Sequence, residues 1–311
     1  MPEPVDDTLV AAALHTPVDV DVDAAWRRLS AVRVKRHSPF RAVVRRPAFG
    51  FAAVALVLTG AGTAAANDWL QIFQTEKFAP IRLEPQDLLA LPDLTAYGQV
   101  KLSAPVDVHP VADAAAAAAE TKLDVPAVSA LPRGVQGQPT YQVGDQVTAT
   151  FTFSAVDAAQ AAARAGKSLP PVPDGLDGHA VRLVAGPGVV EVWGSQGLPA
   201  LIVGRAVAPK AYSEGVPFDT VRDYLLSLPG MPPRLAAQLR TFAADGSTLP
   251  IPVPTEQVVT KSVQVNGTPA TLLVARDRTL AALVWVKDGV MTVVAGSLDT
   301  DEVLSVARTL A

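Results

Sequence analysis

The chain has 311 residues, a formal net charge of −4 and no cysteine; 49% of its residues are apolar and 5% are aromatic. The missing cysteines exclude disulfides, thiolate zinc sites and a cysteine nucleophile. A chain of this length can hold a membrane segment and a folded domain that is stabilised by its own core.

Charge is distributed unevenly over the first 46 residues. Residues 1–23 contain six acidic and no basic residues, whereas residues 24–46 contain eight basic and no acidic residues. We attribute the basic block to the anionic cytoplasmic leaflet of a membrane rather than to nucleic acid, because an apolar segment follows it directly. The pattern predicts that residues 1–46 form a cytoplasmic tail.

A short amphipathic helix is predicted within this tail, over residues 21–34. Trp26 and Leu29 are three residues apart and share one face of that helix. Isolated short helices are marginal in water, and a tryptophan on such a helix has little of its own chain to bury against. We expect Trp26 and Leu29 to bind a cytoplasmic partner protein, or the helix to lie on the membrane surface. The alternative is a mostly disordered tail that only fixes the topology.

Residues 48–66 form a stretch of nineteen residues without a charge. A helix of this length rises ~28 Å, close to the ~30 Å hydrocarbon core of a bilayer. We predict a single transmembrane helix over residues 47–66, with the N-terminus in the cytoplasm and residues 67–311 outside, because basic residues stay on the cytoplasmic side. Trp69 is expected to be an interfacial aromatic anchor. The alternatives are a cleaved export signal, which the end at Ala64 and Ala66 also fits, and a buried helix of a soluble domain.

The predicted extracytoplasmic part alternates strand and helix patterns. Strands are expected over residues 97–103, 146–153 and 198–207, and helices over residues 112–123, 155–165, 218–228 and 232–242. Residues 181–184 and 189–193 are expected to form a hairpin around Gly186-Pro187-Gly188. The stretch 249–254 predicts an extended proline linker that cannot join a central strand, with a possible domain sub-boundary near residues 248–256.

The last sixty residues carry the clearest local pattern. Residues 258–265 and 270–275 flank Asn266-Gly267, which is the strongest short-range signal for a hairpin, and residues 280–286 and 290–295 flank Lys287-Asp288-Gly289. Four antiparallel strands in chain order are therefore predicted. A closing helix follows, with Asp299 and Glu302 in a capping box. Its apolar stripe is expected to dock on the sheet, close to Trp285, through Val303, Leu304, Ala307 and Leu310.

No sequence motif for a reaction is present. Ser195 lacks the glycine two residues before it that a nucleophile elbow needs, because Trp193 stands there. No two of the four histidines have the spacing of metal ligands. Asp174, Asp177 and His179 are expected to be solvated loop residues. We therefore predict no catalytic, cofactor-binding or metal-binding residue and a protein that is not an enzyme.

A series of motifs resembles a known bacterial family. The motifs are residues 69–73, Leu91-Pro92-Asp93-Leu94 with Tyr97-Gly98, Leu131-Pro132-Arg133-Gly134, and residues 249–254, 263–267, 285–289 and 295–310. In this order, over about residues 67–311, they resemble an extracytoplasmic domain of unknown function that follows the single span of anti-sigma-factor-like membrane proteins. The resemblance brings no catalytic residues. It implies a sigma factor as the first candidate for the cytoplasmic partner, although the chain lacks the His/Cys zinc motif of many anti-sigma domains.

These observations predict an α+β fold with a curved antiparallel sheet and packed helices, after an N-terminal transmembrane helix. Two functions are consistent with them. The first is a membrane-anchored extracytoplasmic sensor or regulator that signals through its short inner tail. The second is a tethered or exported module of the cell envelope that binds a lipid or lipoprotein, by analogy with folds in which a curved sheet holds acyl chains against helices.

Overall fold

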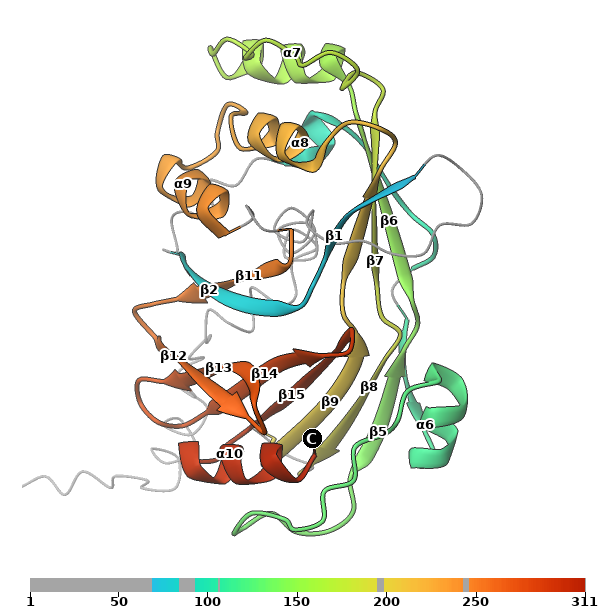
Figure 1. Cartoon of the computed structure of the whole chain (residues 1–311), viewed down its shortest axis with the longest axis vertical. Coiled ribbons are helices and arrows are strands. Elements are labelled where there is room, and N and C mark those ends of the chain that lie inside the picture. Colours follow the sequence, from blue (N-terminus) through green and yellow to red (C-terminus); the bar gives the residue numbers. More distant parts are fainter. Residues whose placement is uncertain (1–68, 84–92, 106, 195–198, 243–245, 311) are drawn as a thin grey trace, which may run out of the picture. The chain divides into compact units, whose positions relative to one another are not determined.

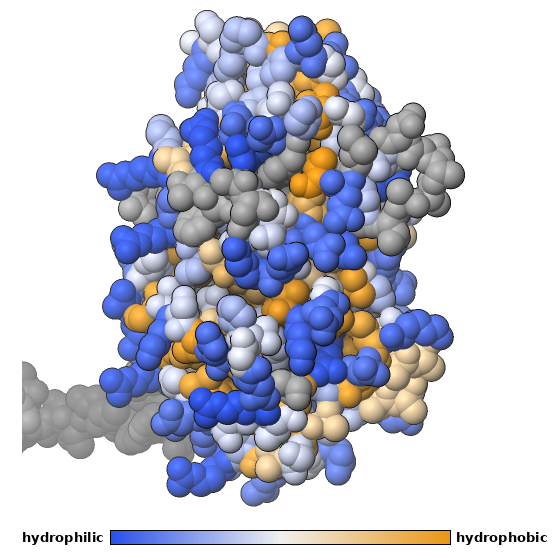
Figure 2. All heavy atoms as spheres, viewed as in Figure 1, coloured by the Kyte–Doolittle hydropathy of each residue, from blue (hydrophilic) through white to orange (hydrophobic). Residues whose placement is uncertain are grey.

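Two antiparallel sheets form the centre of a mixed α+β fold (Figure 1). The computed structural model describes residues 69–83, 93–105, 107–194, 199–242 and 246–310, which all belong to one compact unit. A five-stranded sheet has the order β1-β10-β7-β6-β3, and an eight-stranded sheet has the order β12-β13-β14-β15-β9-β8-β5-β4. On the face of the molecule seen in Figure 2, apolar residues reach the surface in small separate patches between hydrophilic residues.

Four long bent strands run through both sheets. Each consists of two consecutive strands of the chain, one in each sheet, and the neighbour order is the same on both sides. They are β3 (Gly98–Leu102) with β4 (Val108–Val111), β5 (Thr140–Gly144) with β6 (Val147–Phe153), β7 (Ala180–Ala185) with β8 (Gly188–Trp193), and β9 (Leu201–Val207) with β10 (Lys210–Ser213). These strands join the two sheets into one continuous framework.

The hairpin predicted over residues 181–184 and 189–193 is wrong. β7 pairs with β6 and β10, β8 pairs with β5 and β9, and the two strands do not pair with each other. Gly186 donates its backbone N–H to Val207 O and Val207 donates to Pro187 O, so the chain stays beside β9 through the bend. Gly186 and Pro187 therefore redirect the strand from one sheet to the other without reversing it, because pairing with distant strands fixes its direction.

One face of the five-stranded sheet is covered by helices at the end where α7 and α8 lie (Figure 1). β1 (Leu70–Gln74) is one edge strand of this sheet. A short 3-10 helix, η1 (Leu94–Ala96), comes directly before β3 in the chain. α7 (Ala155–Arg164) is capped by Ser154, and α8 (Phe218–Leu225) contributes Tyr224, whose ring meets Phe153 edge-on at 5.4 Å. These aromatic and small apolar side chains form the core of this part of the domain.

The eight-stranded sheet ends in the two predicted hairpins. They are formed by β12 (Val258–Val265), β13 (Thr268–Ala275), β14 (Ala281–Lys287) and β15 (Val290–Gly296). Asn266 and Gly267 have φ values of 45° and 83°, and Asp288 and Gly289 have values of 51° and 75°. Both turns thus have the positive φ angles that the Asn-Gly and Asp-Gly pairs supply at low cost.

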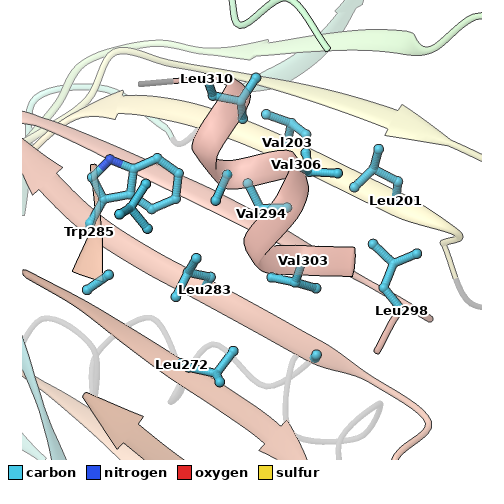
Figure 3. Close-up of a cluster of buried hydrophobic side chains, with 14 of the residues drawn as sticks. Leu201, Val203, Leu272, Leu283, Trp285, Val294, Leu298, Val303, Val306 and Leu310 are labelled. Carbon is cyan, nitrogen blue, oxygen red and sulfur yellow. The ribbon is translucent and has the colours of Figure 1, made fainter. Parts of the chain in front are cut away.

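The closing helix docks on this sheet as predicted. α10 (Thr300–Thr309) has the expected capping box of Asp299 and Glu302. Figure 3 shows Trp285 on β14 close to the helix, within a cluster that includes Val294, Val303 and Leu310. Leu304, which was expected to be buried, is only half-buried, and Val306 is buried in its place. The apolar stripe is therefore rotated slightly from the predicted one.

A small parallel sheet was missed by the sequence analysis. β2 (Lys77–Leu83) pairs in parallel with β11 (Thr248–Pro254), which was predicted to be a linker. Proline lacks a backbone N–H. It is tolerated here because each strand of a two-stranded sheet has one edge whose backbone N–H groups pair with no neighbouring strand. α9 (Pro233–Phe242) packs Leu235, Ala236 and Leu239 around Ile81 of β2.

The predicted membrane span and cytoplasmic tail lie outside the described residues. Within the described residues, no helix has both the length and the apolar character that crossing a bilayer requires.

Candidate functional site

A buried glutamate lies on the helix-covered face of the eight-stranded sheet. Alternation along β8 turns Val189, Glu191 and Trp193 to one face. Val189 packs with Ala117 of α6 (Ala114–Thr121), and Trp193 belongs to the core that α10 covers. Glu191 thus lies between the regions covered by two helices. Its side chain is 2% exposed, and its Oε1 has no hydrogen-bond partner among the described residues.

Arg205 is the cationic group whose charge acts on this carboxyl. It lies on the neighbouring strand β9, directly opposite Val189, and therefore on the same face as Glu191. Its Nη1 donates to Asp124 O at 3.2 Å, and its Nη2 donates to Leu310 O at 2.7 Å. Asp124 follows α6 and Leu310 is the C-terminal cap of α10. One guanidinium therefore connects the segments that end both helices.

The environment of Glu191 favours its neutral form. Burial raises its pKa from 4.5 to about 7, and the nearby Arg205 opposes part of that rise. A buried carboxylate oxygen without a partner is costly, which is the physical cause of the shift. Tyr141, directly opposite on β5, has a pKa raised by burial and then by the negative charges of Glu191 and Asp113. Glu191 therefore changes its charge near neutral pH.

This arrangement can convert a change of proton concentration into a change of local charge. Ionised Glu191 attracts Arg205, whereas neutral Glu191 leaves Arg205 to its two carbonyl acceptors. Because those acceptors belong to the ends of two helical segments, the protonation state of one side chain is linked to the packing of both.

A second buried polar pair connects the residue before β7 with β10. His179 Nε2 lies 2.7 Å from Ser213 Oγ, and Ser213 Oγ donates to Val216 O at 2.6 Å. Since the single hydroxyl proton is used by Val216 O, the histidine is the donor in the first bond. Burial lowers the pKa of His179, against an opposing effect of Glu214. The pair is therefore a structural connection, with the hydroxyl directed away from the imidazole.

The expectation that His179 is a solvated loop residue is wrong. It is 7% exposed, whereas its neighbours Asp174 and Asp177 are exposed. Asp177 accepts the backbone N–H of Ala155 at 2.7 Å and so contributes to the start of α7. His109, which also lies in the predicted extracytoplasmic part, contacts Glu120 at 2.7 Å and Asp107 at 3.5 Å. No cluster that could hold a metal ion is found among the described residues.

Trp69 does not have the exposure expected of an interfacial anchor. It is 9% exposed and packs with Ala180 and Tyr212. The guanidinium of Arg182 lies 4.1 Å from the centre of its ring, a cation–π contact. The tryptophan is therefore held inside the folded domain by two strands of the five-stranded sheet.

The two residues predicted to bind a partner, Trp26 and Leu29, lie outside the described residues, as does Ser195. Glu191 was not predicted as a site residue, although the sequence around it contains a signal. In Val189-Val190-Glu191-Val192-Trp193, alternation places the glutamate on the same face as Val189 and Trp193. Which face is covered depends on helices distant in the sequence, so the pattern alone did not show that the acid is buried.

Comparison of the chain with protein-family models, with curated proteins and with solved structures finds no match.

Proposed function

We propose that the protein is a membrane-anchored extracytoplasmic sensor or regulator without enzymatic activity, anti-sigma-factor-like in its organisation. In this proposal residues 1–46 lie in the cytoplasm, residues 47–66 cross the membrane, and residues 67–311 respond to the state of the cell envelope. The basic block before the uncharged stretch supports the orientation.

The observation that carries the proposal is the short connection between the predicted span and the folded domain. Only Asn67 and Asp68 separate Ala66 from Trp69, whose side chain is buried and stacked by Arg182. β1 starts at the next residue and pairs with β10. A domain that is joined to a membrane helix through only two residues can transmit a change of its own conformation to that helix.

The Glu191 site supplies such a domain with a chemical input. A carboxyl that titrates near neutral pH and neighbours Arg205 gives the domain two charge states in the range of conditions outside a cell. The output in this proposal is the inner tail, where Trp26 and Leu29 bind a cytoplasmic protein, with a sigma factor as the first candidate.

The output is tested with the full-length protein. We expect affinity purification of the tagged chain from solubilised membranes to recover a sigma factor, and the double variant Trp26→Ala/Leu29→Ala to lose it, because both side chains share the predicted binding face. A matched control is Val34→Ala, which shortens an apolar side chain at the end of the same predicted helix.

Recovery of a sigma factor by the wild type and the double variant alike removes Trp26 and Leu29 from the interface. If neither recovers one, a tethered or exported lipid- or lipoprotein-binding module becomes the better proposal.

A further inference from the structure

One face of the five-stranded sheet carries a polar cross-strand row beside the cluster of Trp69, Ala180 and Val184. Directly opposite residues of antiparallel strands point to the same face. The register aligns five residues in this way, one from each strand in the order of the sheet: Gln71, Tyr212, Arg182, Thr150 and Lys101. The opposite face carries Phe151, Val181 and Ala211, which belong to the core under the helices.

The charged strand residues on this face are all basic. Lys101 and Arg182 lie in the row, and Lys210 lies two residues from Tyr212 on β10 and therefore on the same face. None of the five strands contains an acidic residue. β6 adds Thr148, Thr150 and Thr152 to this face through its alternation. The surface thus combines cations and hydroxyl groups.

The side chains on this face differ in how exposed they are to solvent. Lys101 is exposed, and Arg182, Lys210 and Thr150 are half-buried. Tyr212 is 2% exposed, and its hydroxyl group has no hydrogen-bond partner in the part of the chain that the structure describes. A buried hydroxyl without a partner beside cations is a donor that a bound anionic group could use.

The position of this face in the chain indicates its partner. Trp69 packs on it, against Tyr212 and under Arg182, and is three residues from Ala66 at the end of the predicted span. Three residues reach at most about 10 Å. In an anchored protein, the Trp69 end of this face therefore lies close to the lipid headgroups.

We propose that this basic face, formed by Lys101, Thr150, Arg182, Lys210 and Tyr212, binds the anionic phospholipid headgroups of the membrane that anchors the chain. The inference rests on the proposed membrane anchor. Lysine and arginine side chains and hydroxyl donors match the oxygen atoms of phosphate, and basic residues near a membrane surface are attracted to anionic lipid. Binding holds the five-stranded sheet against the bilayer surface.

The test uses the full-length chain in lipid nanodiscs of phosphatidylcholine alone or mixed with phosphatidylglycerol. Because the natural sequence has no cysteine, Thr150→Cys provides a single site for an environment-sensitive fluorophore, and Ser262→Cys on exposed β12 provides the control site. We expect a blue shift at position 150 only with phosphatidylglycerol. High salt and the double variant Lys101→Gln/Lys210→Gln should each remove most of it, because screening and loss of charge weaken the attraction.

The two proposals fail in different ways. If alkaline carbonate extracts the unlabelled chain from native membranes, the anchor is absent and both proposals are overturned. If the chain resists extraction, and position 150 shows no lipid-dependent shift or the same shift as position 262, only the headgroup-binding proposal is overturned. Unchanged melting temperatures of the labelled variants show that the sheet is intact in either case.

Discussion

At the scale of single residues, Glu191 is the buried acid that makes the stability of the domain depend on pH. Its Oε1 is buried without a partner, and its neighbour Arg205 is already bound to two carbonyl oxygens. Burial of this kind is uncommon for a glutamate, because the charged form loses its hydration without full compensation. The same residue therefore lowers stability when it is ionised and gives the domain a dependence on pH.

We predict that Glu191→Gln stabilises the domain at alkaline pH. Folding raises the pKa of Glu191 from 4.5 to about 7, so its contribution is most favourable below pH 4.5 and falls by up to about 3 kcal/mol as the pH rises through 7. Glutamine remains neutral and removes that fall. Urea unfolding of a soluble fragment of residues 67–311 at pH 5 and pH 8 measures the difference.

The control for this experiment is Glu256→Gln, since Glu256 is exposed. It should leave the difference in unfolding free energy between pH 5 and pH 8 as it is in the wild type. An equally steep pH dependence in wild type and Glu191→Gln would show that Glu191 is not the titrating group.

Trp69 shows how a single residue can be assigned to the wrong environment. Its position after an apolar stretch is typical of an interfacial anchor, yet its ring is packed against Ala180 and Tyr212 and stacked by Arg182. The partners are more than a hundred residues away in the sequence. The contact shows that Trp69 belongs to the folded domain.

At the scale of secondary-structure elements, the sequence predicted correctly the elements whose pairing or capping residues are close together in the chain. The hairpins β12–β13 and β14–β15 and the helix α10 were predicted because turn residues and the capping box are local. The β7–β8 hairpin was wrong because Gly and Pro signal a change of direction without fixing its angle. The pairing of β2 with β11 was not predicted, because most of the sequence of the domain lies between these two parallel strands.

We predict that Leu310→Ala lowers the melting temperature of the domain clearly more than Leu304→Ala. Leu310 is 7% exposed in the core under α10, whereas Leu304 is only half-buried at its margin. Loss of a buried leucine side chain costs about 2–5 kcal/mol, and in a domain of this size each kcal/mol lowers the melting temperature by about 2–4 °C.

The two variants make the same chemical change on one short segment, so they differ mainly in burial. Differential scanning calorimetry of the fragment of residues 67–311 measures both. Equal melting temperatures for Leu310→Ala and the wild type would mean that the end of α10 is not docked on the sheet.

At the scale of the whole molecule, the sequence places a basic block, an apolar stretch and a folded domain one after another. The four bent strands connect both sheets, and the first strand begins four residues after Ala66. A membrane anchor would therefore join a framework that extends through the domain. Both proposals depend on the predicted anchor, and the proposed direction of signalling depends also on its orientation.

We predict that a cysteine at Ser262 reacts with a membrane-impermeant maleimide in intact cells and that a cysteine at Ser30 reacts only after lysis. Ser262 is exposed on β12, and Ser30 lies within the basic block, which the positive-inside rule assigns to the cytoplasm. The cysteine-free wild type is the background control. The reverse labelling pattern would overturn the orientation and the proposed direction of signalling.

The sequence alone determined the features that depend on neighbouring residues. These are the α+β class, the two C-terminal hairpins, the capped closing helix, and helices close to the predicted ranges at α6, α7, α8 and α9. Periodicity, turn residues and caps act within a few residues, so they can be read without knowing the rest of the fold. The cytoplasmic tail and membrane span are also sequence predictions, and they lie outside the described residues.

Only the tertiary structure decided which faces are covered and which distant strands pair. It places Glu191 between the regions that α6 and α10 cover, where the charge of Arg205 acts on it. It also buries Trp69 against Arg182 and aligns Lys101, Arg182 and Tyr212 across one sheet. These environments arise from contacts between residues far apart in the chain. The burial that sets the pKa of Glu191 and the charge of the basic face are therefore properties of the fold, not of any local segment.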